Sequence, residues 1–278
     1  MREWKDVIAK APTGTGKTFA FGIPMIEHID AESEDLQGLI LAPTRELAIQ
    51  ICDELRGLLT YYKNIRVAVV YGGAKIEGQI KQLKNHPQIV VATPGRLMDH
   101  YKRHTLSFDK VQTVVLDEAD RMLDMGFVHD VKKVIAKLPA KRQNLMFSAT
   151  MPAEIEQLAA GILHEPAFVK VDPVSSTVDR IQQSLYYVEK GNKKLLLPWL
   201  IKNLQPPVVN ALVFSRTKHG ADKIAKDLTK QGIPAAAIHG NKSQTARVTA
   251  LEDFKSGKTR VPVSYTHLRA HETRGNLV

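Results

Sequence analysis

The chain has 278 residues, 44% hydrophobic and 24% charged, which is typical of a globular protein of about two domains. No apolar run reaches the roughly 18 residues that a membrane-spanning helix needs, the one cysteine (Cys52) cannot form an internal disulfide bond, and no signal segment is evident, so we expect a cytoplasmic protein. The net charge of +10 is uneven: residues 1–164 contain 21 Lys/Arg and 20 Asp/Glu, whereas residues 165–278 contain 18 and 9. The excess of basic residues in 165–278 indicates either a surface that binds a polyanion or one that only keeps the protein in solution.

Short apolar runs alternate with helical patterns in the first part of the chain. The runs occupy residues 7–9, 39–42, 67–70, 89–92, 114–116 and 145–147. They lack polar alternation, which is typical of strands that are buried on both faces of a parallel sheet. Between them, apolar residues recur at helical spacing, as at Phe19, Ile23 and Ile26. The pattern predicts an α/β fold with an open parallel sheet and right-handed crossovers in residues 1–168.

A second, shorter β/α series follows a stretch of turn and cap residues at 172–177, where we expect a linker spanning residues 169–182. In this series we expect strands at 185–188, 211–214 and 235–238, and helices near 193–202, 218–230 and 244–254. Three strands are fewer than in the first series. We therefore expect a partial second α/β domain over residues 183–261.

The segment APTGTGKT at residues 11–18 follows the first expected strand and begins a helix. Gly14 and Gly16 let the backbone curl so that its N–H groups face phosphate oxygens, and the helix N-terminus adds its positive dipole end. Lys17 is expected to reach the β- and γ-phosphates, and the Thr18 hydroxyl to ligate magnesium. A chance loop is the alternative, because Ala11 replaces the first glycine of the general pattern. The expected nucleotide-binding residues are Thr13, Gly14, Thr15, Gly16, Lys17 and Thr18.

A second candidate segment, VVLDEAD at residues 114–120, is an apolar strand that ends in adjacent acids. Ligands of doubly wound folds bind at the carboxyl ends of the strands. Asp117 is therefore expected to hold Mg²⁺, and Glu118 to activate the attacking water as a general base. Acids at a strand end are also common as solvated turn residues, but the upstream phosphate loop favours the catalytic interpretation, with Lys17, Asp117 and Glu118 as the catalytic residues.

With these segments the chain resembles the DEAD-box RNA helicases of helicase superfamily two, and further motifs agree over residues 5 to about 261. They are PTRELA at 43–48, GG at 72–73, TPGR at 93–96, SAT at 148–150, LVFSRTK at 212–218 and HGNKSQ at 239–244 with Arg247. The sequences of residues 121–127 and 138–144 are similar to those of bacterial RhlE-like members. The resemblance implies two RecA-like domains in tandem, ATP and Mg²⁺ as cofactors, and RNA duplex unwinding or RNA–protein remodelling coupled to ATP hydrolysis.

The resemblance also implies an RNA-binding set whose members contact the backbone and read no bases. Its expected members are Pro43, Thr44, Arg45, Gly72, Gly73, Thr93, Pro94, Gly95, Arg96, Ser215, Arg216 and Thr217. Asp120, Ser148 and Thr150 are expected to couple nucleotide state to strand separation, through hydrogen bonds to Asp117 or Asp120. Alternatives remain: Arg45 can pair with Glu46, and the two hydroxyls can cap the helix beginning near Pro152.

Two departures from the family pattern limit these expectations. No adenine-recognition segment precedes Ala11, so no residue is assigned to the base. Residues 262–278 resemble translated sequencing-adapter DNA rather than the family's continuation, and Pro262 is unexpected in a central strand. The arginine-rich motif that stabilises the transferred phosphoryl group is not found, so we expect this chain itself to turn over ATP negligibly. A non-enzymatic nucleotide- and RNA-binding fragment and a DNA-acting motor remain alternative functions.

Overall fold

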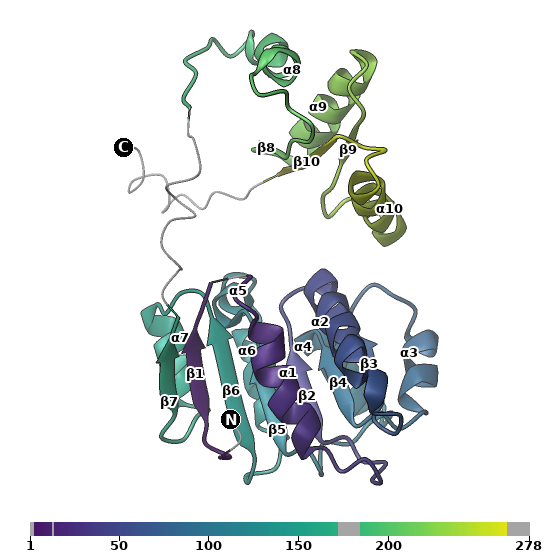
Figure 1. Cartoon of the computed structure of the whole chain (residues 1–278), viewed down its shortest axis with the longest axis vertical. Coiled ribbons are helices and arrows are strands. Elements are labelled where there is room, and N and C mark those ends of the chain that lie inside the picture. Colours follow the sequence, from purple (N-terminus) through teal and green to yellow (C-terminus); the bar gives the residue numbers. More distant parts are fainter. Residues whose placement is uncertain (1–2, 13, 172–183, 266–278) are drawn as a thin grey trace. The chain divides into compact units, whose positions relative to one another are not determined.

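The computed structural model describes residues 3–12, 14–171 and 184–265 (Figure 1). The chain divides into two compact units, Met1–Ile181 and Gln182–Val278. Thr13, most of the expected linker and residues 266–278 lie outside the described residues.

The first unit is built on one parallel sheet of seven strands in the order β3-β4-β2-β5-β6-β1-β7. The strands are β1 (Val7–Lys10), β2 (Gly38–Leu41), β3 (Val67–Val70), β4 (Ile89–Ala92), β5 (Thr113–Leu116), β6 (Gln143–Ser148) and β7 (Ala167–Lys170). Pairing is parallel throughout; Leu39, for example, pairs with Val90 on one side and Val114 on the other. The six expected strands are confirmed as β1 to β6.

Strand β7 was not expected from the sequence. It pairs with β1, where Val7 lies opposite Ala167, and all four of its side chains are exposed. Its sequence, Ala167-Phe168-Val169-Lys170, is as apolar as the run at residues 7–9, yet the strand lies at the edge of the sheet and buries no face. The expected domain end at residue 168 falls inside β7, so Val169 and Lys170 belong to the first unit.

Helices cover both faces of this sheet (Figure 1). They are α1 (Lys17–His28), α2 (Arg45–Leu58), the short 3-10 helix η1 (Leu59–Tyr61), α3 (Ile76–Leu83), α4 (Pro94–Lys102), α5 (Ala119–Asp124), α6 (Val128–Ile135) and α7 (Ala153–Ala160). Successive strand residues point to opposite faces, so Ile40 packs with α1 and α2, whereas Leu39 and Leu41 pack with α4, α6 and α7. Because both faces are buried, the strands are apolar without alternation, as the sequence predicted.

The second unit contains a smaller parallel sheet of three strands in the order β8-β10-β9. Its elements are α8 (Lys193–Asn203), β8 (Val213–Ser215), α9 (Lys218–Lys230), β9 (Ala235–Ala237), α10 (Gln244–Lys255) and β10 (Val261–Tyr265). A small core joins α8, α9 and the central strand β10, with Ile201, Leu228 and Val263 among its buried members. The α/β class predicted for both units is confirmed.

Two expectations for the second unit differ from the structure. Residues 185–188 do not form a strand: they have no strand partner among the described residues, and the side chains of Leu185 and Tyr187 are 75% and 92% exposed. Pro262, in turn, lies within central strand β10. The main-chain polar groups of Val261 and Val263 point toward β9, so those of Pro262, between them, point toward β8. Pairing of β10 with β8 begins at the next residue, Val263. The missing N–H therefore falls just before that ladder starts.

Candidate functional site

The loop after β1 has the geometry of an anion site. Gly14 and Gly16 have φ angles of +82° and +80°, and a Cβ at either position would meet no atom within 4 Å. Glycine is needed there for the left-handed backbone and not for space. Gly16 is the N-cap of α1, which has neither a side-chain cap nor an acidic residue in its first turn. The first N–H groups of α1 therefore remain open to an anionic ligand.

Two threonines lie close to this anion site. The Thr15 hydroxyl donates to the Pro12 carbonyl oxygen at 2.8 Å, which stabilises the turn of the loop. Thr18 is half-buried in the first turn of α1, next to Lys17. The position of Thr13 is not described.

Lys17 and Asp117 form the buried charged pair of the site. Their Nζ and Oδ1 atoms are 3.8 Å apart, and the two side chains are only 9% and 4% exposed. Lys17 Nζ has no hydrogen-bond partner among the described residues. Burial raises the pKa of Asp117 to about 6, although the Lys17 ammonium opposes this rise. A buried ammonium without a hydrogen bond is costly, and a phosphate oxygen would satisfy it.

Asp117 and Glu118 are neighbours that are held by different groups. The Asp117 amide donates to the Leu41 carbonyl oxygen at 3.0 Å, which ties the end of β5 to β2. Glu118 accepts an ion-pair hydrogen bond from Arg121 at 3.2 Å. Its φ of +51° is uncommon for a residue with a side chain and costs backbone energy. The two carboxylates are thus separated by a strained turn at the carboxyl end of β5.

Ser148 and Thr150, at the end of β6, contact Asp120 in α5. The Asp120 amide donates to the Ser148 hydroxyl at 3.2 Å, and Thr150 donates to Asp120 Oδ2 from both its amide and its hydroxyl. Burial by itself would raise the pKa of Asp120, but the hydrogen bonds from Thr150 and Ser148 together lower it. Of Asp117 and Asp120, the two acids expected as partners, Asp120 is the one to which both hydroxyls are hydrogen-bonded.

The expected RNA-binding loops of the first unit come together after β2, β3 and β4. The Gly72 amide donates to the Thr93 hydroxyl at 3.3 Å. Arg96 donates to the Ala74 carbonyl oxygen at 3.1 Å. At Gly73 the φ of +83° favours glycine, and a Cβ there would displace the Arg45 guanidinium.

The remaining members of this set lie at helix starts. Thr44 is the N-cap of α2 and accepts from the Leu47 amide at 3.2 Å, directly after the buried Pro43. Pro94 and Gly95 begin α4. Because all strands run the same way, these loops and the phosphate loop share the carboxyl edge of one sheet.

Ser215, Arg216 and Thr217 connect β8 to α9 in the second unit. Thr217 is the N-cap of α9 and accepts from the Gly220 amide at 3.0 Å. A Cβ at Gly220 would collide with the Ser215 hydroxyl, so this connection is tightly folded. Arg216 is exposed.

Sequence reasoning missed Gln79, which is buried on α3 and bonded to the main chain just before the Gly72-Gly73 loop. It lies between Ile76 and Leu83 on the apolar face of its helix. A polar residue at a core position was the signal that could have found it.

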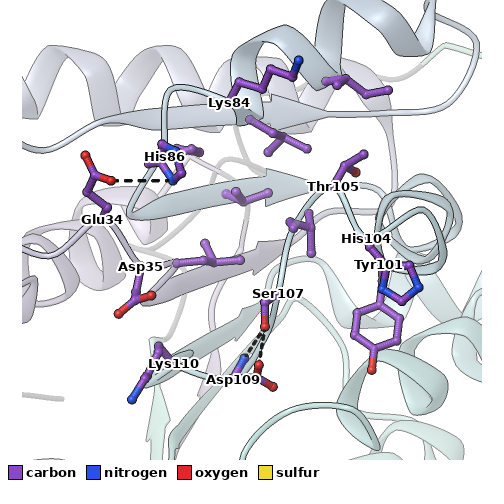
Figure 2. A pocket seen from close by; sticks show the side chains of 16 residues that line it. Glu34, Asp35, Lys84, His86, Tyr101, His104, Thr105, Ser107, Asp109 and Lys110 are labelled. Carbon is purple, nitrogen blue, oxygen red and sulfur yellow. Dashed lines mark hydrogen bonds and ion pairs between the residues drawn. The ribbon is translucent and has the colours of Figure 1, made fainter.

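A cavity of about 770 Å³ lies at the other edge of the sheet from the expected nucleotide- and RNA-binding loops (Figure 2). It is lined by segments that precede β2, β4 and β5, at the amino edge of the sheet, with Glu34, Lys84, His86 and Lys110 among its walls. Its mixed charges do not indicate a nucleotide. Within the described parts of the chain, every helix is too short or too polar to cross a membrane.

The chain matches two protein families. Residues 1–158 match the DEAD/DEAH box helicase family, and residues 192–269 match the helicase conserved C-terminal domain. The chain therefore belongs to the DEAD/DEAH box helicase family, and membership implies the use of ATP.

Individual relatives agree with this family. The chain is 47% identical over 262 residues to an ATP-dependent RNA helicase CshA of Listeria monocytogenes, covering 94% of this chain and 50% of the relative. It is 46% identical over 260 residues to the DEAD-box ATP-dependent RNA helicase CshA of Bacillus subtilis, covering 94% and 52%. Among solved structures, a DEAD box protein of Methanococcus jannaschii is 39% identical with a TM-score of 0.57, covering 99% of this chain and 72% of that one.

The two curated relatives are ATP-dependent RNA helicases of bacteria, and this chain has the tandem RecA-like α/β fold of its structural neighbours. The chain spans about half the length of the curated relatives it matches. Both curated relatives are named CshA. The similarity of this chain to RhlE-like members stays a prediction.

Proposed function

We propose that this chain carries the motor of an ATP-dependent RNA helicase, which locally separates RNA duplexes or remodels RNA–protein complexes. The observation that carries the proposal is the buried Lys17 ammonium, 3.8 Å from Asp117 and without a hydrogen bond among the described residues, at the start of a helix whose N–H groups are uncapped. Such a group calls for an anionic ligand, and the β- and γ-phosphates of ATP have the charge to satisfy it.

The residues around Lys17 suit the other requirements of phosphoryl transfer. The Thr18 hydroxyl and the Asp117 carboxylate are the hard oxygen ligands that Mg²⁺ prefers, and the ion would neutralise phosphate charge when bound. Glu118 is proposed as the general base that accepts the proton of the attacking water, with Arg121 orienting its carboxylate. The water oxygen bonds to the γ-phosphorus as the bond to the β,γ-bridging oxygen breaks, and ADP leaves.

RNA is proposed to bind through its backbone at the Arg45, Gly72-Gly73 and Thr93–Arg96 loops. Main-chain amides, a hydroxyl and guanidinium groups are suitable phosphate ligands and carry no base preference. The Ser215–Thr217 connection and the basic excess of residues 165–278 support a contribution from the second unit. Asp120, Ser148 and Thr150 are proposed to relay nucleotide state between these loops.

The test compares ATP-dependent separation of matched RNA and DNA duplexes by the chain, with nucleotide and single-strand binding measured alongside. ATP-dependent separation of RNA supports the proposal and would overturn the expectation, drawn from the sequence, that this chain turns over ATP negligibly. Equal or better separation of DNA would favour a DNA-acting motor. Binding of both ligands without turnover would favour a nucleotide-dependent RNA clamp. A cytoplasmic location is also proposed, and cell fractionation tests it.

A further inference from the structure

We propose that Gln79 is a positioning residue for RNA: it holds the Gly72-Gly73 loop in its binding shape by clamping the main chain of Tyr71. The inference rests on the proposed RNA-binding role of that loop. Gln79 is 4% exposed and lies on α3. Its Oε1 accepts from the Tyr71 amide at 3.1 Å, and its Nε2 donates to the Tyr71 carbonyl oxygen at 3.0 Å.

This pair of bonds replaces a strand partner. Strand β3 is at the edge of the sheet, ends at Val70 and pairs only with β4 among the described residues. Tyr71 is the next residue, and the Gln79 amide satisfies both of its main-chain groups as a neighbouring strand would. The orientation of the amide is determined by this contact, because Tyr71 N–H can only donate and its oxygen can only accept.

A second layer holds Gln79 itself. His100 of α4 places Nε2 at 3.3 Å from Gln79 Oε1 and Nδ1 at 2.8 Å from the Thr105 hydroxyl. Since Oε1 carries no proton, His100 donates to it from Nε2. The Thr105 hydroxyl donates to the His100 carbonyl oxygen at 3.0 Å, so its contact with Nδ1 does not fix the charge of the ring. Burial first, and then the Arg96 charge, lower the pKa of His100, which favours the neutral ring.

The clamp acts where the loop meets the expected RNA contacts. Beyond Tyr71, the Gly72 amide donates to the Thr93 hydroxyl, the Ala74 carbonyl oxygen accepts from Arg96, and the Arg45 guanidinium occupies the space where a side chain at Gly73 would begin. Those three side chains belong to the expected RNA-binding set, whereas Gln79 does not. Loss of the clamp would release the loop at its start, and Gly72 and Gly73 would no longer present their main chain in one place.

The experiment uses the full 278-residue chain and three readouts: affinity for a fluorescein-labelled oligouridine in the presence of a non-hydrolysable ATP analogue, affinity for a fluorescent ADP, and thermal unfolding. Gln79→Leu is expected to weaken oligouridine binding by about fivefold to thirtyfold and to leave ADP affinity unchanged. The matched control is Gln82→Leu, on the exposed side of the same helix, which should change neither affinity.

The outcomes separate this inference from the function on which it rests. If the unaltered chain binds ADP but no oligouridine, the proposed RNA function fails, and the inference with it. If the chain binds both ligands and Gln79→Leu binds oligouridine equally well, only the positioning role of Gln79 is overturned. A parallel loss of both affinities with a lowered unfolding temperature would show a merely structural role and also overturn it.

Two further measurements cover a Gln79→Leu variant that does not fold. Gln79→Glu keeps the acceptor for the Tyr71 amide and for His100 but cannot donate to the Tyr71 oxygen, so oligouridine binding should still weaken at constant ADP affinity. Amide hydrogen exchange of the unaltered chain needs no variant. The Tyr71 amide should be protected, and exchange as fast as that of an exposed loop amide would overturn the clamp.

Discussion

Thr150 holds the carboxylate of Asp120 with two of its own groups, since its amide and hydroxyl lie 2.9 and 2.8 Å from Oδ2. The two residues come from different elements, the loop after β6 and the short helix α5. Asp117 and Glu118 immediately precede α5 in the chain. A displacement of the loop after β6 would therefore be transmitted through α5 to the two acids that are proposed to act on the nucleotide.

Replacing Thr150 by valine removes the hydroxyl and keeps the amide. The lost hydrogen bond should lower the free energy of unfolding by about 1 kcal/mol at neutral pH. Asp120 has a lowered pKa in the folded state, so its stabilising contribution is present above the unfolded pKa and is lost as pH falls through the folded pKa. The deficit of Thr150→Val should thus shrink in acid. Urea unfolding at about pH 7 and about pH 3 measures this change.

Thr60→Val is the control, because the Thr60 hydroxyl, exposed in η1, donates to the uncharged carbonyl oxygen of Gly57. A deficit of Thr150→Val that stayed the same at both pH values would contradict the assigned role of the Asp120 contact.

The contribution of Asp117 to stability should depend on pH in the opposite direction to that of Asp120. Its folded pKa is raised from 3.8 to about 6, so between these values the folded state binds more protons than the unfolded one. Stability should therefore fall as pH rises through this window, by an upper limit of about 3 kcal/mol. Asp117→Asn cannot ionise and should lose this part of the pH dependence, whatever its absolute stability. Denaturant titrations from about pH 4 to about pH 8 compare the two slopes, and equal slopes would rule out the raised pKa.

Lys17→Met should abolish most nucleotide binding, because it removes the buried cation that lacks a hydrogen-bond partner among the described residues. Truncation of one member of a buried charge contact costs at least about 2 kcal/mol, or about thirtyfold in affinity. The pKa of Asp117 should rise further, since Lys17 lowers it. Isothermal titration with ADP checks the affinity, with the exposed Lys63→Met as the control. Retained affinity in Lys17→Met would refute the phosphate role.

Gly72 and Gly73 offer a matched pair of substitutions. A Cβ at Gly72 meets nothing within 4 Å, whereas at Gly73 it meets the Arg45 guanidinium on a backbone with φ of +83°. Gly73→Ala should cost about 1–2 kcal/mol in backbone strain and displace Arg45, so RNA binding should weaken. Gly72→Ala should keep the fold and most of the affinity. Anisotropy titrations with labelled single-stranded RNA compare them, and a larger loss at Gly72 would reverse the assignment.

Much of the first unit could be predicted from sequence because burial on both sheet faces leaves a plain signal. Residues 39–42 and 89–92 are uniformly apolar since each residue faces one of two cores. The placement of Asp117 followed equally directly, because the end of an apolar strand is the edge of the sheet.

The rest depended on pairing, which a local pattern does not contain. Strand β7 has no buried side chain, and the expected strand at 185–188 has strand-like residues but no partner among the described residues. Pro262 is tolerated in β10 only because pairing with β8 starts one residue later. The role of Gln79 was hidden for the same reason: both bonds go to a main chain eight residues away.

The way in which each strand is packed also bears on how such a protein can change. Every side chain of β2 and β4 is engaged in one core or the other, so a substitution there alters stability before anything else. The residues proposed to act on ligands lie at or just past the strand ends, outside the two apolar cores. Substitutions in these loops can therefore change ligand preference while the strands stay the same. One scaffold can thus be kept through several changes of function.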